Sequence, residues 1–227
     1  MDASLIYILL EDTPEGNLLL KGEVFKYIVK VRRHGIGDRL YFRAKENMDL
    51  LYRYEVKVIE NRSIELEQIS CEEKVVASKK PLHIAWCVID VKSIEKVLPS
   101  LNEIGVDKIS FISCERSQKN FKLDLKRFER ILEASMQQCG RSSYMEFDIY
   151  KNIADFIQEF PQTKVFDFTD KVLDDYTDVT TVLVGCEGGF SSDEKKFLLS
   201  QDVFRLDTPM TLRSESAVMA VASKVLL

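Results

Sequence analysis

The fold is best approached from one stretch near the C-terminal end of the chain. It reads Val182-Leu183-Val184-Gly185-Cys186-Glu187-Gly188-Gly189-Phe190-Ser191-Ser192-Asp193-Glu194. An apolar strand ends at Gly185, a glycine-rich loop follows, and Ser191 with Glu194 has the pattern of a capping box that starts a helix. Glycines let a backbone approach a ligand closely, and a helix N-terminus presents free N–H groups. Because ligands of open α/β sheets bind at the carboxyl ends of strands, we favour a ligand loop over a plain turn.

Strands and helices alternate around this stretch. From residue 82 on, strands are expected at 82–89, 108–113, 145–150, 164–168, 180–184 and 203–206. Helical spacing of apolar residues predicts helices at 93–104, between Asp124 and Gly140, at 152–160, at 192–200 and from Ser214 onward. The alternation predicts an α/β fold with a largely parallel sheet.

The first eighty residues follow a different pattern. Short strands are expected at 5–10, 39–43, 50–59 and 63–69, with a short helix at 22–31. This pattern is typical of a small, mostly antiparallel barrel. The polar stretch 71–80 before Pro81 is interpreted as a linker, so we divide the chain into domains at 1–72 and 73–227.

The charge distribution leaves two interpretations open. The net charge of −5 is unusual for a protein that binds nucleic acid. However, Lys and Arg are concentrated between Lys21 and Lys45, where the acidic residues are Glu23 and Asp38. This basic segment fits contacts to phosphates as well as it fits a solvated positive surface.

Several classes of site are excluded by pattern. The chain has no G-x-x-x-x-G-K-[ST], no G-x-G-x-x-G after its first α/β strand and no G-x-S-x-G, which argues against a P-loop, a dinucleotide fold and a serine hydrolase. Its five cysteines are scattered and its two histidines belong to no ligand cluster, so no disulfide framework and no metal site are expected. With no apolar run of about 18 residues and no basic leader, we expect a cytoplasmic protein without a membrane partner.

Two further stretches carry polar residues beside expected strand ends. In 208–217, Arg213 and Glu215 precede a helix rich in small residues, and they could equally be a solvated helix start. In 115–120, Arg116 follows a strand, and Gln138 and Arg141 lie near the end of the next helix. Each of these could also be ordinary polar surface.

In their order along the chain, these motifs resemble the ribosomal RNA small-subunit methyltransferase E (RsmE) family of the SPOUT superfamily of knotted methyltransferases. Residues 185–194 match the family pattern G-P-E-G-G-[FL]-[ST]-x-x-E at every position except Cys186, and residues 212–217 match L-R-[TS]-E-[TS]-A. Further agreement comes from residues 101–106, 115–117 and 134–141, and from Val31-Arg32-Arg33 before Gly37-Asp38. The resemblance covers nearly the whole chain.

The resemblance implies a fold and a set of site residues. The fold would be a PUA-like β-barrel that binds RNA, followed by a SPOUT α/β domain with a deep trefoil knot, in a homodimer. S-adenosylmethionine would be bound by Val184, Gly185, Glu187, Gly188, Gly189, Leu206, Thr211, Leu212 and Ser214. RNA would be bound by Lys26, Lys30, Arg32, Arg33, Arg116, Gln138 and Arg141, and the tentative catalytic residues are Arg213 and Glu215.

The implied reaction is methylation of N3 of a uridine in 16S rRNA of the small ribosomal subunit. Arg213 would stabilise charge on the uridine, and Glu215 would orient the base or accept its proton. Three alternatives stay open: a different rRNA or tRNA base, a catalytically silent RNA-binding protein, and an enzyme that binds a phosphate ligand at residues 185–189.

The sequence also departs from the family pattern. Cys186 stands where the family usually has proline, and residues 207–211 replace a glycine and a shorter link. Lys26-Tyr27 replaces paired histidines, and Arg32 replaces a leucine. We therefore expect a less rigid loop at Cys186.

Overall fold

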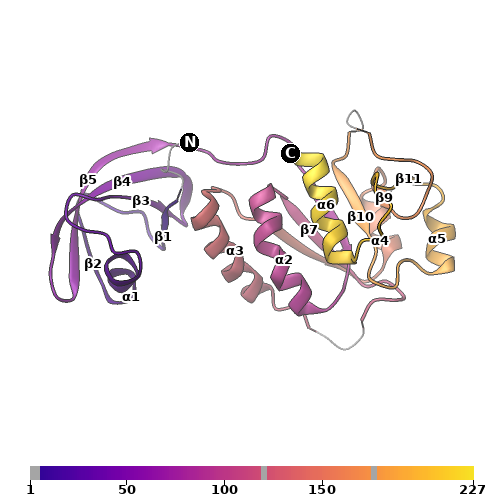
Figure 1. The fold of residues 1–227 in the computed structure, drawn as a ribbon, viewed down its shortest axis with the longest axis horizontal. Helices are drawn as coiled ribbons and strands as arrows, with labels where there is room; N and C mark the ends of the chain where they lie inside the picture. The colour runs from indigo at the N-terminus through magenta and orange to yellow at the C-terminus, as the bar shows by residue number, and fades with distance from the viewer. Residues whose placement is uncertain (1–5, 119–121, 175–177) are drawn as a thin grey trace. The chain divides into compact units, whose positions relative to one another are not determined.

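The computed structural model describes residues 6–118, 122–174 and 178–227 and divides the chain into two compact units (Figure 1). The first unit comprises Met1–Ala77 together with Met136–Ser143, and the second comprises Ser78–Ser135 together with Tyr144–Leu227. The segment Met136–Ser143, from the middle of the chain, therefore belongs to the same unit as the N-terminal residues.

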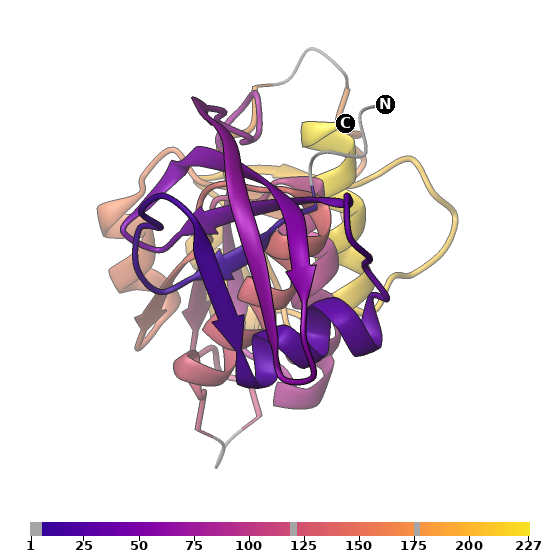
Figure 2. The same ribbon diagram turned by 90° about the vertical axis from the view of Figure 1, so that its left-hand side faces the viewer.

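The first unit is built on a five-stranded sheet with the order β1-β3-β4-β5-β2. Its strands are β1 (Ile8–Leu10), β2 (Leu18–Lys21), β3 (Arg39–Ala44), β4 (Asn47–Ile59) and β5 (Ser63–Glu73). β1 pairs with β3 in parallel, and the other pairs are antiparallel. Register shifts within the β3–β4 and β4–β5 pairs accompany the curl of the sheet, which Figure 2 shows facing the viewer.

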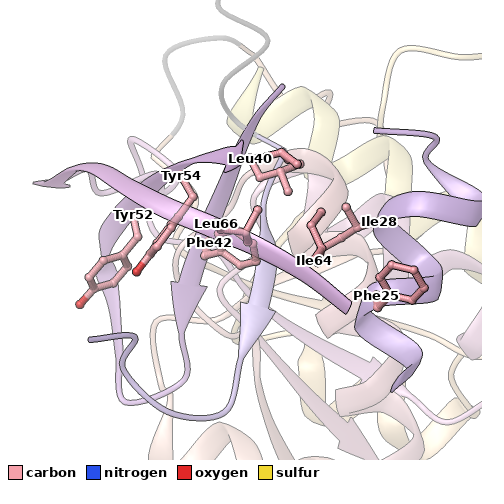
Figure 3. Close-up of a cluster of buried hydrophobic side chains, with 9 residues drawn as sticks. Phe25, Ile28, Leu40, Phe42, Tyr52, Tyr54, Ile64 and Leu66 are labelled. Atoms are coloured by element: carbon pink, nitrogen blue, oxygen red, sulfur yellow. The ribbon is translucent and has the colours of Figure 1, made fainter. Parts of the chain in front are cut away.

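One short helical segment closes the core of this unit. α1 (Gly22–Phe25) continues as the π-helical turn η2 (Lys26–Val31), which brings Phe25 and Ile28 to the inner side of the sheet. There they pack in a cluster with strand residues such as Phe42 and Tyr54, whose rings meet edge to face at 5.4 Å (Figure 3). The helical spacing predicted for 22–31 is thus confirmed.

The second unit is built on a six-stranded, fully parallel sheet with the order β11-β9-β10-β6-β7-β8. Its strands are β6 (His83–Cys87), β7 (Lys108–Ile112), β8 (Glu146–Tyr150), β9 (Lys164–Phe166), β10 (Thr181–Val184) and β11 (Asp202–Phe204). The predicted parallel α/β sheet is confirmed. The chain runs outward from β6 to β8 and later inserts β10 beside β6, so the order of strands reverses at that point.

In the described part of the chain, four helices connect these strands and a fifth follows β11. They are α2 (Val91–Ile104), α3 (Leu125–Cys139), α4 (Ile153–Glu159), α5 (Ser192–Leu198) and α6 (Ser214–Leu226). α2 and α6 lie side by side (Figure 1). The Asp124 carboxylate accepts a hydrogen bond from Arg127 N at 3.1 Å, and Gly140 N donates to Met136 O at 2.8 Å at the other end of α3, so both predicted ends are confirmed.

The predicted start of the linker was wrong, and one strand was missed. β5 continues through Glu73, which pairs with Leu50, so the expected linker at 71–80 begins as strand. β2 was not predicted at all. The strand expected at 5–10 is seen as Ile8–Leu10, and its first residue lies outside the described residues.

Candidate functional site

A cavity of about 330 Å³ lies in the second unit, where β9, β10 and β11 end and α6 begins. Its lining is Arg116, Phe166, Asp167, Phe168, Val184, Gly185, Cys186, Glu187, Gly188, Gly189, Phe190, Lys195, Arg205, Leu206, Thr208, Met210, Thr211, Leu212, Ser214 and Ala217. This is the carboxyl edge of the parallel sheet, where the sequence places a ligand loop.

The loop after β10 is a tight backbone turn. Gly189 N donates to Cys186 O at 2.9 Å, and Gly189 has a φ of +64°, which L side chains adopt only with strain. A Cβ on Gly185 would lie 3.4 Å from the Gly189 Cα, so the two ends of the turn are close together. The cavity wall here is mostly backbone.

The predicted capping box after this loop is confirmed. Glu194 N donates to Ser191 Oγ at 3.2 Å, and Ser191 N donates to Glu194 Oε2 at 2.7 Å. The other carboxylate oxygen of Glu194 accepts a hydrogen bond from Glu115 N at 2.8 Å. Glu194 therefore joins the loop after β10 to the loop after β7.

Arg116 makes a second link between these two loops. Its Nη1 donates to Gly188 O at 2.7 Å, and a Cβ added to Gly188 would lie 3.2 Å from the Cβ of Arg116. A side chain at position 188 would therefore require the arginine side chain to shift. Arg116, which the resemblance assigns to RNA, thus stands on the wall of the cavity.

Ser214 fixes the other side of the loop. Trp86 Nε1 donates to Ser214 Oγ at 2.8 Å, and Ser214 Oγ donates to Gly185 O at 2.5 Å. Trp86 and Ser214 are both buried. This chain of hydrogen bonds connects β6, the first residue of α6 and the first residue of the glycine loop.

Residues 207–211, where the sequence departs from the family pattern, contribute Thr208, Met210 and Thr211 to the cavity lining. Thr208 N donates to Leu206 O at 2.9 Å, and Met210 N donates to Thr208 Oγ1 at 3.1 Å, so the link folds on itself. The Met210 side chain is 71% exposed although it borders the cavity. The longer link thus adds an apolar side chain at the rim.

All nine residues predicted to bind the cofactor line this one cavity. Arg213 and Glu215 do not, although their chain neighbours Leu212 and Ser214 do. Arg213 is the exposed N-cap of α6, and Glu215 is half-buried in its first turn. The structure thus places the two tentative catalytic residues beside the cavity in the chain but outside its lining.

Five charged or aromatic lining residues were not singled out from the sequence: Phe166, Asp167, Phe168, Lys195 and Arg205. Lys195 Nζ lies 2.8 Å from the Asp167 carboxylate, an ion pair that joins the end of β9 to α5. Asp167 could have been found from its position directly after an apolar strand.

The basic residues predicted to bind RNA in the first unit lie on and just after α1 and η2. Lys26, Lys30, Arg32 and Arg33 are all exposed, and Lys26 pairs with Glu23 at 2.7 Å. The Arg32 guanidinium lies over the Tyr27 ring, 5.4 Å from its centroid, and its Nη2 donates to Gln138 Oε1 at 3.1 Å. Arg32 and Gln138, which are far apart in the chain and were both predicted to bind RNA, are therefore in contact. We call residues 22–33 the basic helix.

Arg141 is placed differently from the other predicted RNA-binding residues. It is 4% exposed, and its Nε donates to Ser143 Oγ at 3.2 Å. Its backbone carbonyl accepts a hydrogen bond from the Tyr7 hydroxyl at 2.8 Å. Its guanidinium is thus part of the interior of the first unit, because the segment 136–143 packs there.

The described part of the chain contains neither a cluster of metal ligands nor a helix that could span a bilayer. Within residues 6–118, 122–174 and 178–227, no group of three or more His, Cys, Asp or Glu side chains could hold a metal ion. Over the same ranges, no helix has the length and apolar character needed to cross a bilayer.

Comparison with known proteins gives concordant matches. A family model described as an RNA methyltransferase domain matches residues 77–226. A curated relative from Helicobacter pylori, ribosomal RNA small subunit methyltransferase E, is 35% identical, and the match covers 92% of this chain and 94% of the relative.

Solved structures give the same fold. A putative methyltransferase from Legionella pneumophila, solved with the bound cofactor SAM, has a TM-score of 0.76 at 20% identity, covering 97% of this chain and 96% of that one. A ribosomal RNA small subunit methyltransferase E from Neisseria gonorrhoeae, bound to S-adenosyl methionine, has a TM-score of 0.74 at 16% identity, covering 96% and 94%.

Proposed function

Because the chain belongs to the RNA methyltransferase family, and within it to the ribosomal RNA small-subunit methyltransferase E group, we propose that it methylates N3 of a uridine in 16S rRNA. The methyl donor in this proposal is S-adenosylmethionine. The observation that carries the proposal is the convergence of nine residues, chosen from sequence, on a single cavity.

The lining of the cavity suits S-adenosylmethionine. Side chains such as Phe166, Val184 and Leu212 offer an apolar surface to an adenine ring, and the glycine loop offers backbone groups. Asp167, Glu187 and Arg116 supply charges of both signs, which suits the sugar hydroxyls and the amino acid end of the molecule. When bound, this cofactor supplies a methyl group activated by a sulfonium centre.

The residues around the cavity have separate tasks in the proposed reaction. The Trp86–Ser214–Gly185 hydrogen bonds and the Arg116–Gly188 bond hold the loop in one conformation, so little reorganisation is needed when the reactants meet. Uridine N3 must lose its proton before it can attack. Glu215, in the first turn of α6, would accept or orient that proton, and the Arg213 guanidinium would stabilise the charge left on the base.

The first unit would hold the RNA in this proposal. The exposed cations of the basic helix suit phosphates, and Gln138 beside Arg32 adds an amide that can hydrogen-bond a base edge. We also propose, from the family resemblance, a PUA-like first domain at 1–72, a knotted SPOUT domain at 73–227, and a homodimer in the cytoplasm.

The test is methyl transfer to small ribosomal subunits from cells that lack the gene. We expect labelled methyl groups at a single uridine in 16S rRNA, and calorimetric binding of S-adenosylmethionine to the protein alone. Transfer to tRNA or to another rRNA base would redirect the proposal to a different substrate. RNA binding without cofactor binding or transfer would contradict it in favour of a silent RNA-binding protein.

Arg213→Ala and Glu215→Gln test the assigned roles. We expect each to lower kcat by at least about a hundredfold, as removal of a general acid–base group or a charge stabiliser does. The affinity for S-adenosylmethionine should change little because neither side chain lines the cavity. Full activity in both variants would remove these residues from the reaction.

A further inference from the structure

Three cysteine thiols gather at the carboxyl ends of three adjacent strands in the second unit. Cys87 ends β6, Cys114 lies two residues beyond β7, and Cys186 lies two residues beyond β10, and the strand order places β6 between the other two. The sulfurs of Cys114 and Cys186 are 3.7 Å apart. All three residues are buried.

The Cys114–Cys186 pair is one of three contacts between the same two loops. The other two are the Arg116 Nη1 hydrogen bond to Gly188 O and the Glu115 N hydrogen bond to Glu194. Both of these are noncovalent, whereas two neighbouring thiols can form a bond. The Cys114–Cys186 pair is therefore the contact that could link the two loops covalently.

The surroundings of Cys114 favour its reactive form. Ser117 Oγ lies 3.0 Å from its sulfur, and the neighbouring thiols of Cys186 and Cys87 hold the pKa of Cys114 well below its usual range, although burial opposes them. The same interaction raises the pKa of Cys186. A thiolate beside a second thiol is the arrangement of redox-sensing cysteines. Because Cys186 lines the cavity, a small oxidant can reach the pair.

We propose that Cys114 and Cys186 are a redox-active pair that closes to a reversible disulfide in the presence of hydrogen peroxide. The Cys114 thiolate attacks one peroxide oxygen, the O–O bond breaks, and hydroxide leaves, which gives a sulfenic acid on Cys114. The Cys186 sulfur then attacks the Cys114 sulfur, the S–O bond breaks, and water leaves. In total, two thiols are oxidised by two electrons, and one peroxide is reduced to two waters.

Closing this bond would change the cofactor loop. The sulfurs must approach from 3.7 Å to about 2.05 Å. Cys186 would lose the thiol hydrogen that it donates to Gly189 O at 3.7 Å, and its backbone lies within the glycine loop. The loop would therefore shift toward Cys114 and narrow or distort the cavity. Resting on the proposed function, this predicts weaker binding of S-adenosylmethionine by the oxidised protein.

Peptide mapping tests the bond itself. The full-length protein is treated with hydrogen peroxide, blocked with N-ethylmaleimide under denaturing conditions, digested and analysed by mass spectrometry without reduction. We expect a Cys114–Cys186 linked peptide that dithiothreitol removes, that Cys114→Ala and Cys186→Ser each abolish, and that Cys71→Ser, a change at an exposed cysteine in the first unit, leaves intact. A Cys87–Cys114 link, or none in the folded wild-type protein, overturns the proposal.

Calorimetry tests the effect on the cofactor loop. We expect S-adenosylmethionine to bind the oxidised wild-type protein at least about tenfold more weakly than the reduced one, since a displacement of about 1 Å at a binding site is costly. Dithiothreitol should restore the affinity. Peroxide-treated Cys114→Ala, at a residue outside the cavity lining, controls for oxidation of the exposed Met210, and peroxide should leave the affinity of this variant unchanged.

The outcomes separate the two proposals. Equal affinities of the oxidised and reduced wild-type protein would overturn the effect on the loop. If the reduced wild-type protein binds no S-adenosylmethionine, the proposed function and the effect on the cofactor both fail. The peptide map would then be the only test of the disulfide itself.

Discussion

The cavity of the second unit and the basic helix of the first unit use charge in opposite ways. In the cavity, charged side chains are bound to the loops themselves: Arg116 to the Gly188 carbonyl and Lys195 to Asp167. In the basic helix, the charged side chains of Lys30 and Arg33 are exposed to solvent. The first arrangement fixes a shape, whereas the second offers charge to a partner.

This difference predicts how substitutions should behave. Changes around the cavity act through geometry and burial, so their effects should be insensitive to salt. Changes in the basic helix act through exposed charge, and such effects weaken as salt screens it over about 10 Å at 0.1 M. The following predictions test this contrast from the largest expected effect to the smallest.

His83 is a buried basic group of the second unit and should affect stability rather than binding. It is 9% exposed, its Nε2 lies 2.7 Å from Ser110 Oγ, and its ring packs against those of Phe156 and Phe160. Burial, helped by the charge of Lys108, lowers its pKa to about 4 from 6.5.

The sign of the pH effect follows from that shift. Between pH 6.5 and about 4, His83 is protonated in the unfolded chain but neutral in the folded protein. The free energy of unfolding is therefore highest above pH 6.5 and falls as the pH drops toward 4. We expect a loss of about 3 kcal/mol, since a tenfold change in proton affinity is worth about 1.4 kcal/mol. Urea unfolding at pH 7.5 and 4.5 measures this decrease in the free energy of unfolding. In His83→Gln the decrease should be smaller by about that amount. An equal loss in the variant contradicts the assignment.

Gly188→Val tests whether the cavity depends on shape. The added Cβ would lie 3.2 Å from the Cβ of Arg116 and 3.3 Å from its Cδ, so the arginine side chain must shift. We expect S-adenosylmethionine affinity to fall by about a hundredfold, independently of salt, because the site is displaced by about 1 Å. Calorimetry at low and high salt measures this. As a control, Gly16→Val removes a glycine with φ +60° from the first unit and should leave this affinity unchanged.

Ser214→Ala should have a smaller effect on the same loop. It removes the hydroxyl that accepts from Trp86 Nε1 and donates to Gly185 O, and it leaves a buried indole N–H without that partner. A lost buried hydrogen bond costs about 1–3 kcal/mol, so we expect about tenfold weaker cofactor binding and a lower unfolding midpoint. Trp86 is the only tryptophan, and its fluorescence reports the change directly. Ser216→Ala, in the same helix, is the matched control.

Arg32→Gln should have the smallest effect on binding of the four substitutions. Unlike the effects of the cavity substitutions, its effect should depend on the salt concentration. Loss of this exposed cation should weaken RNA binding by about threefold at physiological salt and lower the salt slope by about one. Cofactor affinity should stay unchanged. Filter binding at several salt concentrations measures the slope, and Arg62→Gln provides a control for a charge outside the basic helix. A loss that does not vary with salt would assign Arg32 a structural role through Tyr27 and Gln138.

Local structure was predicted well wherever neighbours in sequence decide it. The capping box at Ser191 and Glu194 and both ends of α3 depend on residues within one helical turn, and all were confirmed. The end of β5 was missed because Cys71–Glu73 is polar and becomes strand only by pairing with β4. β2 was missed because four residues carry too little pattern to stand out.

The sequence by itself determined the alternation of strands and helices and the glycine loop, because burial periodicity and turn chemistry are local properties. The family resemblance, also visible in the sequence, selected nine of the residues that line the cavity. The tertiary structure alone decided which distant segments meet. It set the strand order, placed residues 136–143 in the first unit, buried Arg141, and brought Arg116 to Gly188 and Cys114 to Cys186. The physical reason is that backbone hydrogen bonds between strands are alike for every residue, so nothing local specifies which strands pair.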